Sequence, residues 1–159
     1  MGRFFGIVKG YEEKEINLPQ RATKHSAGYD FEAAEDIEIV PIWRTLVHNF
    51  NIKPQLIPTG IKASMEDDEG LFLYNRSSNP LKRFLMLANG VGVVDSDYFE
   101  NEDNDGHIHF PMWNFGIHPV TIKKGERIGQ GVFQKFLLVD DETTPKRKRV
   151  GGTGSTGTK

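Results

Sequence analysis

Short runs of β-branched, aromatic and aliphatic residues recur along the whole chain, and segments rich in Gly, Pro, Asn and Asp separate them. In residues 107–112 the apolar side chains alternate with other residues, so Ile108, Phe110 and Met112 share one face of an extended segment. The other strand-like runs are residues 4–8, 37–40, 71–74, 91–94 and 133–139. This pattern predicts an all-β protein, a jelly roll or a barrel, without a nucleotide-binding βαβ unit.

One short helix is predicted, at residues 77–84. Ser77, Ser78 or Asn79 can cap its first turn, and Pro80 fits that turn because no backbone N–H is needed there. The helix would begin close to the end of the strand-like run 71–74.

The length of 159 residues is one at which a single compact core is normally built. We expect residues 1–141 to form that domain. Beyond it a basic run, residues 145–149, precedes a tail of Gly, Ser and Thr. The tail cannot form a core of its own, so residues 142–159 are expected to be a flexible C-terminal arm.

Composition excludes several classes of protein. A formal net charge of −2 argues against a protein that coats nucleic acid, which needs a broad basic surface. The absence of cysteine excludes disulfides, thiolate metal sites and cysteine nucleophiles. No apolar run approaches the roughly 20 residues of a membrane span, and the first residues lack the apolar stretch of a signal peptide. We expect an intracellular protein of the cytoplasm, or of the nucleus if the source is eukaryotic, with neither nucleic acid nor membrane as a partner.

Two segments have the chemistry of anion binding. In 76–78 a guanidinium, two hydroxyls and the N–H groups of a helix start could converge on one anion, although an ordinary helix cap has the same appearance. In the arm, glycines allow backbone N–H groups to turn toward phosphate, and Ser155, Thr156 and Arg149 add donors. On its own the arm could equally be a solvated terminus.

Three further segments carry polar residues in glycine-rich surroundings. They are 27–31, which contains Asp30; 89–98, which reads as a tight hairpin followed by Asp95; and 125–130. Taken in order with 76–78 and the arm, these segments resemble the five motifs of the trimeric deoxyuridine triphosphatase (dUTPase) family. The resemblance extends over nearly the whole chain.

This resemblance implies a dUTPase-type jelly roll that hydrolyses dUTP to dUMP and pyrophosphate with Mg²⁺, removing dUTP and supplying dUMP for thymidylate synthesis. It also implies a homotrimer whose active sites are shared between subunits. Asp95 would activate the water that attacks the α-phosphorus. Ser77 would donate near the α–β bridging oxygen, and Arg76, Ser78 and Gln130 would hold phosphate oxygens. Ser77 and Gln130 are thus catalytic candidates beside Asp95.

Substrate choice is assigned to the 89–98 segment. The Asn89 side chain and the backbone after it would recognise uracil, and Tyr98 would pack under the deoxyribose and exclude a 2′-hydroxyl. Asp30 would contact the Mg²⁺ through water, because that ion keeps several waters when it is bound to a triphosphate. The full set of predicted substrate-binding residues is Arg76, Ser77, Ser78, Asn89, Gly92, Val93, Val94, Asp95, Tyr98, Gln130, Arg149, Thr153, Gly154 and Ser155.

The chain departs from the family pattern at four places. Asn75 stands where a proline usually precedes the Arg-Ser pair, and we expect it to loosen that turn. Phe99-Glu100-Asn101 stands where Arg-Gly-Glu is usual, and an acidic loop follows it. Lys148 or Arg149 could provide the arm's phosphate ligand, and Arg149 is preferred. Thr153 stands where an aromatic ring usually stacks on uracil.

Several segments of the chain have a second interpretation. The acidic stretch 101–106 resembles the start of a calcium loop, but Met112 stands where the loop needs Glu. His107 and His109 share a strand face, yet no third metal ligand is evident. The basic run 145–149 could be a nuclear-targeting patch or could attract the triphosphate. As functions, a dCTP deaminase of the same fold and a dUTP-binding regulatory protein, a nucleotide sensor, remain alternatives.

Overall fold

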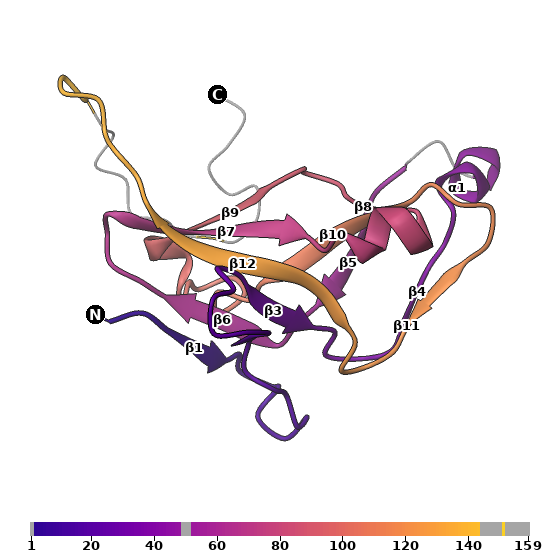
Figure 1. Cartoon of the computed structure of the whole chain (residues 1–159), viewed down its shortest axis with the longest axis horizontal. Coiled ribbons are helices and arrows are strands. Elements are labelled where there is room, and N and C mark those ends of the chain that lie inside the picture. The colour runs from indigo at the N-terminus through magenta and orange to yellow at the C-terminus, as the bar shows by residue number, and fades with distance from the viewer. Residues whose placement is uncertain (1, 49–51, 144–150, 152–159) are drawn as a thin grey trace.

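The computed structural model describes residues 2–48, 52–143 and 151, and within them most of the regular secondary structure is β-strand (Figure 1). The all-β expectation is therefore confirmed. In chain order the strands are β1 (Phe4–Ile7), β2 (Gln20–Arg21), β3 (Tyr29–Glu32), β4 (Ile37–Ile39), β5 (Gln55–Pro58), β6 (Ile61–Ser64), β7 (Glu69–Asn75), β8 (Leu85–Leu87), β9 (Gly92–Asp95), β10 (His109–Asn114), β11 (Val120–Ile122) and β12 (Arg127–Lys135).

The largest sheet has the order β2-β3-β12-β7-β9, with β12 in its centre. In Figure 1, β12 crosses the molecule between β7 and β3. Its neighbours pair with it antiparallel on both sides, so Gln130 lies opposite Asp30 on β3 and opposite Tyr74 on β7. A register shift between Arg127 and Gly129 interrupts the β3 ladder. Segments that are distant in the sequence meet along this one strand.

A second sheet has the order β5-β10-β8, and smaller pairs join β1 to β6 and β4 to β11. The alternation predicted for 107–112 is confirmed, because Ile108, Phe110 and Met112 are all buried in the core. The Phe110 ring packs against Phe31 of β3, with ring centroids 5.5 Å apart, and so joins the two larger sheets. Burial of apolar rings between sheets is the main stabilising term for this kind of architecture.

The predicted helix is present but shorter than expected. A single π-helical turn, η1, covers Asn79–Arg83, with Pro80 in its first turn. It ends at Phe84, whose φ of 55° is left-handed and cannot continue a right-handed helix. The Ser78 side chain makes no cap hydrogen bond, so the predicted capping is wrong at that residue.

Two helices were not predicted. A 3-10 turn, η2, covers Ser96–Tyr98, and an α-helix, α1, covers Ile42–His48. On α1 the side chains of Trp43 and Leu46 remain exposed. The helix is joined to the loop between β10 and β11 by the Trp43 indole N–H, which donates to the Gly116 carbonyl over 3.2 Å. The apolar residues of this segment do not recur with a clear helical spacing, so the sequence does not predict the helix.

Two strand expectations need correction. The run 133–139 is strand only as far as Lys135, and beyond it Leu137 is 97% exposed. The segment 89–98 is also no simple hairpin, since β8 pairs with β10 whereas β9 pairs with β7. A turn closed by the Gly90 N–H and the Leu87 carbonyl, 3.1 Å apart, therefore connects two different sheets.

The predicted arm lies almost wholly outside the described residues, and Arg149, Thr153, Gly154 and Ser155 are among those not described. In the part of the chain that is described, no helix is long and apolar enough to cross a membrane.

Candidate active site

Residues from three of the predicted motifs meet at one end of the three adjacent strands β3, β12 and β7. Asp30 lies on β3, Gln130 lies opposite it on β12, and Arg76 follows the last residue of β7. The Arg76 Nε is 3.6 Å from Asp30 Oδ1, and Arg127 Nη1 is 3.2 Å from Asp30 Oδ2. We call Asp30, Arg76, Arg127 and Gln130 the anion cluster, because two guanidinium groups converge there on one carboxylate.

Glycines make room for the Gln130 side chain. A Cβ on Gly28 would overlap the Gln130 amide, so the glycine in the first motif allows the two strands' side chains to approach. On either side of Gln130, Gly129 lies against the Phe110 ring and Gly131 lies against Phe31, positions where a Cβ would overlap those rings. Because successive residues of a strand point to opposite faces, two inward glycines leave Gln130 directed outward.

The turn that presents Arg76 is fastened by Asn75, contrary to the loosening expected at that departure from the family pattern. The Asn75 Oδ1 accepts from the Arg76 backbone N–H over 3.0 Å and from Asn79 Nδ2 over 2.7 Å. The Asn75 Nδ2 donates to the Leu85 carbonyl over 3.0 Å. Buried Asn79 also donates to the Ile128 carbonyl over 2.8 Å, which ties the turn to β12. Side-chain amides thus supply the rigidity that a proline would give.

The two serines of this turn lie beside the anion cluster in sequence. Ser77 is exposed, and Ser78 is half-buried at the start of η1. Backbone N–H groups at the first turn of a helix-like segment and nearby hydroxyls offer hydrogen-bond donors to an anion. The turn therefore places Ser77 and Ser78 directly after Arg76, at the start of η1.

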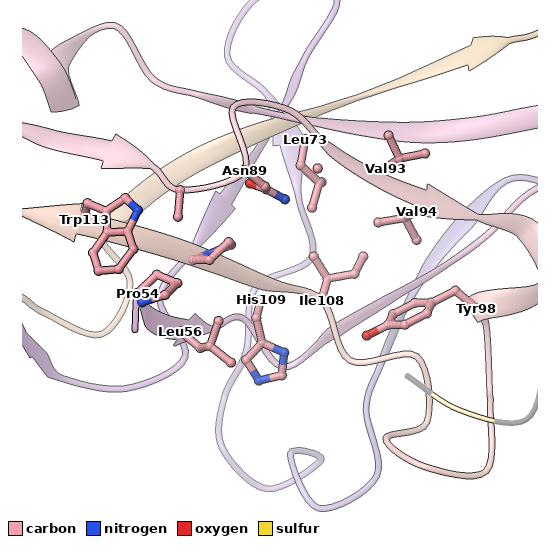
Figure 2. A pocket seen from close by; sticks show the side chains of 13 residues that line it. Pro54, Leu56, Leu73, Asn89, Val93, Val94, Tyr98, Ile108, His109 and Trp113 are labelled. Atoms are coloured by element: carbon pink, nitrogen blue, oxygen red, sulfur yellow. The ribbon is translucent and has the colours of Figure 1, made fainter. Parts of the chain in front are cut away.

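A cavity of about 580 Å³ opens between β9 and the outer face of the β5-β10-β8 sheet (Figure 2). Five of the predicted substrate-binding residues line it, namely Asn89, Gly92, Val93, Val94 and Tyr98. We call this cavity the base pocket. Most of its other lining side chains are apolar, as is usual for a small-molecule site in which a few polar groups give specificity.

The remaining wall of the base pocket was not predicted as a binding surface. It comes from β5 and β10, where Leu56, His109, Pro111 and Trp113 line the cavity. In Figure 2, Tyr98 and Trp113 lie at opposite sides of the cavity. The alternation along β10 predicts which side chains point away from the core, but it does not predict that β9 folds across them.

Tyr98 and two histidines share one hydrogen-bonded corner of the pocket. The Tyr98 hydroxyl donates to the His107 carbonyl over 2.9 Å, and the His109 Nδ1 is 3.1 Å from the same oxygen. The imidazole rings of His107 and His109 lie 3.9 Å apart, and buried His107 accepts a hydrogen bond from the Gly60 N–H through Nε2. Of the two, His109 lines the pocket, and buried His107 packs against it.

Burial determines the charge of these histidines. It lowers the pKa of His107 to about 4, with smaller contributions from His109 and Lys14, and it lowers the pKa of His109 as well. Both imidazoles are therefore neutral near pH 7. In the described part of the chain no three His, Cys, Asp or Glu side chains are grouped so that they could hold a metal ion.

Asp95 and the anion cluster lie at different ends of the same sheet. Asp95 is opposite Gly70, the second residue of β7, whereas Arg76 comes directly after that strand ends. Six residues separate these positions, which corresponds to about 20 Å at roughly 3.3 Å per residue. Within one chain the Asp95 carboxylate and the Arg76 guanidinium therefore do not meet.

Comparison with known proteins places this arrangement in a family. A sequence profile described as dUTPase matches residues 14–157. The chain is 51% identical to the deoxyuridine 5′-triphosphate nucleotidohydrolase of Lactococcus lactis over 156 residues, which is 98% of this chain and 97% of the relative. It is 38% identical to the protein of the same name from Desulfitobacterium hafniense, with 92% and 91% of the two chains covered.

Solved structures agree with the sequence relatives. A crystal structure of dUTPase from Streptococcus mutans superposes with a TM-score of 0.75 at 42% identity, covering 88% of this chain and 99% of that chain. The dUTPase from phage phi11 of S. aureus superposes with a TM-score of 0.69 at 16% identity, covering 93% and 99%, and so shares the fold. On these grounds the chain belongs to the dUTPase family.

Proposed function

We propose that this protein hydrolyses dUTP to dUMP and pyrophosphate. The observation that carries the proposal is the pairing of two partial sites that match the two halves of such a substrate. The base pocket offers an apolar cavity with the Asn89 amide, and the anion cluster offers two guanidinium groups and the Gln130 amide. Both lie on residues that match family motifs, in a chain 51% identical to a dUTP nucleotidohydrolase.

In the base pocket, Asn89 and the backbone of β9 would hydrogen-bond the uracil edge. Gly92 supports this role because it has no side chain to cover the backbone. A Cβ there would lie 3.1 Å from the Leu73 side chain and 3.4 Å from Asn89 Nδ2. The Tyr98 ring lines the same cavity and would pack under the deoxyribose. A cavity with few polar groups favours a small planar base over a bulkier or charged ligand.

The phosphate groups would be held by Arg76, Ser77, Ser78 and Gln130. The Arg76 guanidinium can hold two phosphate oxygens at once, and Ser77 would donate where negative charge builds on the leaving pyrophosphate. Arg127, to which sequence reasoning gave no role, lies 3.2 Å from the same Asp30 carboxylate and adds a second guanidinium. Positioning and charge stabilisation of this kind account for most of the catalysis of phosphoryl transfer.

Asp95 would act as the general base. A water oxygen bonds to the α-phosphorus, the bond from that phosphorus to the α–β bridging oxygen breaks, and pyrophosphate leaves with the bond's electron pair. The Asp95 carboxylate takes the proton of the attacking water. The exposed position of Asp95 at the end of β9, directly after residues that line the base pocket, supports this role.

Mg²⁺ is the cofactor that the proposal requires, and the anion cluster fits it only as an ion carried by the triphosphate. Asp30 is already opposed by two guanidinium groups, so its carboxylate suits contact through water rather than direct ligation. When bound, the ion neutralises negative charge on the phosphate oxygens. Asp30 would also hold Arg76 and Arg127 in position for those oxygens.

We further propose that the active form is a homotrimer with shared sites. The separation of about 20 Å along β7 supports sharing, because a single chain does not bring Asp95 to its own anion cluster. Asp95 and the base pocket of one subunit would meet the anion cluster of the next. The arm, residues 142–159, would close over the bound nucleotide, and release of dUMP would supply thymidylate synthesis.

The experiment that tests the function measures pyrophosphate release from dUTP, dCTP, dTTP and UTP with the purified protein and Mg²⁺. We expect rapid release from dUTP and little from the others. Ammonia release from dCTP would instead identify a deaminase. Tight dUTP binding without turnover would identify a nucleotide-binding regulator, and either result would overturn the proposal.

A further inference from the structure

The Tyr98 hydroxyl is held from two sides by the segment that follows it. It donates to the His107 carbonyl over 2.9 Å, and it accepts from Asn104 Nδ2 over 2.8 Å. A carbonyl oxygen only accepts, so the phenol proton points to His107 and Asn104 must be the donor of the second bond. Both hydrogen bonds thus have a fixed direction.

Backbone donors fix the orientation of the two amide side chains in this segment. The Asn104 Oδ1 accepts from the Gly106 N–H over 3.2 Å and from Asn101 Nδ2 over 2.8 Å. The Asn101 Oδ1 accepts from the N–H groups of Asp103 and Asn104, over 3.0 and 3.1 Å. The Asn101 Nδ2 also donates to the Tyr98 carbonyl over 2.8 Å. Only one placement of each oxygen and nitrogen satisfies all these contacts.

Lys62 anchors this loop, residues 99–106, to the body of the protein. Its buried Nζ lies 2.8 Å from Glu100 Oε1 and 3.0 Å from Asp105 Oδ2. Burial alone would favour the neutral forms, yet hydrogen bonds raise the pKa of Lys62 and lower the pKa of Asp105, so both remain charged. The Lys9 N–H also donates to Asp105, over 2.9 Å. Breaking a buried pair leaves an uncompensated charge, so the loop is held in one place.

From these contacts we infer that Asn104 is a positioning residue for Tyr98 and, through it, for the choice of deoxyribose over ribose. The inference rests on the proposed function, in which the Tyr98 ring lies under the sugar. With both polar positions of its hydroxyl engaged, the ring does not tilt away from an incoming ribose. The extra 2′-hydroxyl then meets a fixed ring and finds no hydrogen-bond partner there, which costs binding free energy.

The loop directly after Tyr98 has the polar side chains that this role needs. Its Asn101 and Asn104 side chains turn back onto that tyrosine. Gly106 allows this fold, since its φ is +79° and a Cβ there would lie 2.8 Å from the Tyr98 carbonyl oxygen. The loop's composition is therefore matched to the residue that it surrounds.

The first test replaces Asn104 and compares kcat/KM for dUTP with kcat/KM for UTP. For Asn104→Ala we expect that ratio to fall about five-fold or more, the size of effect that one neutral hydrogen bond produces. Asn104→Asp keeps the side-chain shape but has no donor near pH 7, so it should lose the same discrimination even if the alanine variant folds poorly. Glu102→Ala, an exposed position in the same loop, is the matched control and should keep the ratio.

A double-mutant cycle separates positioning through Tyr98 from a general effect of the loop. Tyr98→Phe keeps the ring and removes both hydrogen bonds of the hydroxyl. If Asn104 acts through that hydroxyl, adding Asn104→Ala to Tyr98→Phe changes the dUTP to UTP ratio no further. Independent losses that multiply in the double variant would overturn the inference.

The outcomes distinguish this inference from the function on which it rests. Failure of the wild-type protein to hydrolyse dUTP would refute the proposed function and the inference together. Hydrolysis of dUTP by the wild-type protein, with an unchanged dUTP to UTP ratio in both Asn104 variants, would refute the inference alone.

Discussion

Asp95 and Arg76 lie at opposite ends of β7, the first opposite Gly70 and the second just beyond Asn75. In the proposed mechanism the Asp95 carboxylate and the Arg76 guanidinium act on one triphosphate. The proposal therefore requires two copies of the chain at each complete site, and this requirement can be tested directly.

Mixed assemblies of two inactive variants should regain activity. Arg76→Ala chains keep Asp95, and Asp95→Asn chains keep Arg76, so some sites between unlike subunits contain both intact residues. With random assembly of equal amounts in a closed ring, roughly one quarter of the sites are intact. The measurement is dUTP turnover of co-expressed chains that carry two different affinity tags. Each variant alone is the control, and absence of any recovery would mean that one chain forms the whole site.

Asp95→Asn should bind dUTP yet lose most turnover. The amide keeps the shape of the carboxylate but does not accept a proton from water, and general-base catalysis typically contributes about 10²- to 10⁴-fold. Single-turnover kinetics and titration calorimetry measure the two quantities separately. Asp97→Asn, an exposed acidic position two residues away, is the matched control. Near-normal hydrolysis by Asp95→Asn would remove Asp95 from the catalytic role.

Gly129→Ala should destabilise the fold. A Cβ at this position would overlap the ring of buried Phe110, which has no room to move within the core. Overpacking of this kind costs about 1–3 kcal/mol. Gly6→Ala is a suitable control, because its Cβ would make ordinary contact with the Lys62 side chain, at 3.5 Å. Thermal unfolding of the two variants should differ clearly, and equal Tm values would show that β12 can shift to make room.

Stability should fall as the pH falls between about 6.5 and 4 because of His107. Burial lowers its pKa to about 4 in the folded state, from the ordinary value of 6.5. In that window the unfolded chain binds more protons, so the free energy of unfolding decreases with decreasing pH, by about 3 kcal/mol at most. Above the window this contribution is fully present.

The His107 prediction is checked by urea unfolding at several pH values. His107→Gln keeps an acceptor for the Gly60 N–H but does not titrate, so its free energy of unfolding should fall less steeply in this window. His25→Gln, at an exposed position, should behave like the wild-type protein. His109 acts in the same direction, since burial lowers its pKa too. An unchanged slope in His107→Gln would assign the pH dependence to other groups.

The sequence predicts local structure well where the side-chain pattern repeats. Ile108, Phe110 and Met112 alternate, and all three are buried as expected. Strand ends are less predictable, because the apolar run 133–139 looks like strand throughout although pairing stops at Lys135. A residue's own type does not reveal whether a partner strand extends alongside it. For the same reason the segment 89–98 looked like a hairpin although it connects two sheets.

The sequence predicts the motif residues of the site, but it does not predict which residues from other strands lie beside them. Asp30, Arg76 and Gln130 were chosen by resemblance, and the antiparallel registers of β12 bring all three together. Arg127 and the β10 wall of the base pocket were missed, because their neighbours come from distant parts of the chain. The expectation that Asn75 loosens the turn is wrong, because the absence of a proline does not reveal that the asparagine side chain makes hydrogen bonds that fasten the turn.

The central place of β12 bears on how the chain reaches its native state during synthesis. This strand joins β3 to β7, yet it is the last strand in the described sequence to leave the ribosome. Until then β3 and β7 have unpaired edges, which are available to other nascent chains. Contacts between such distant segments also make folding slow. Any truncation before residue 127 removes β12, so the edges of β3 and β7 that it pairs would stay open.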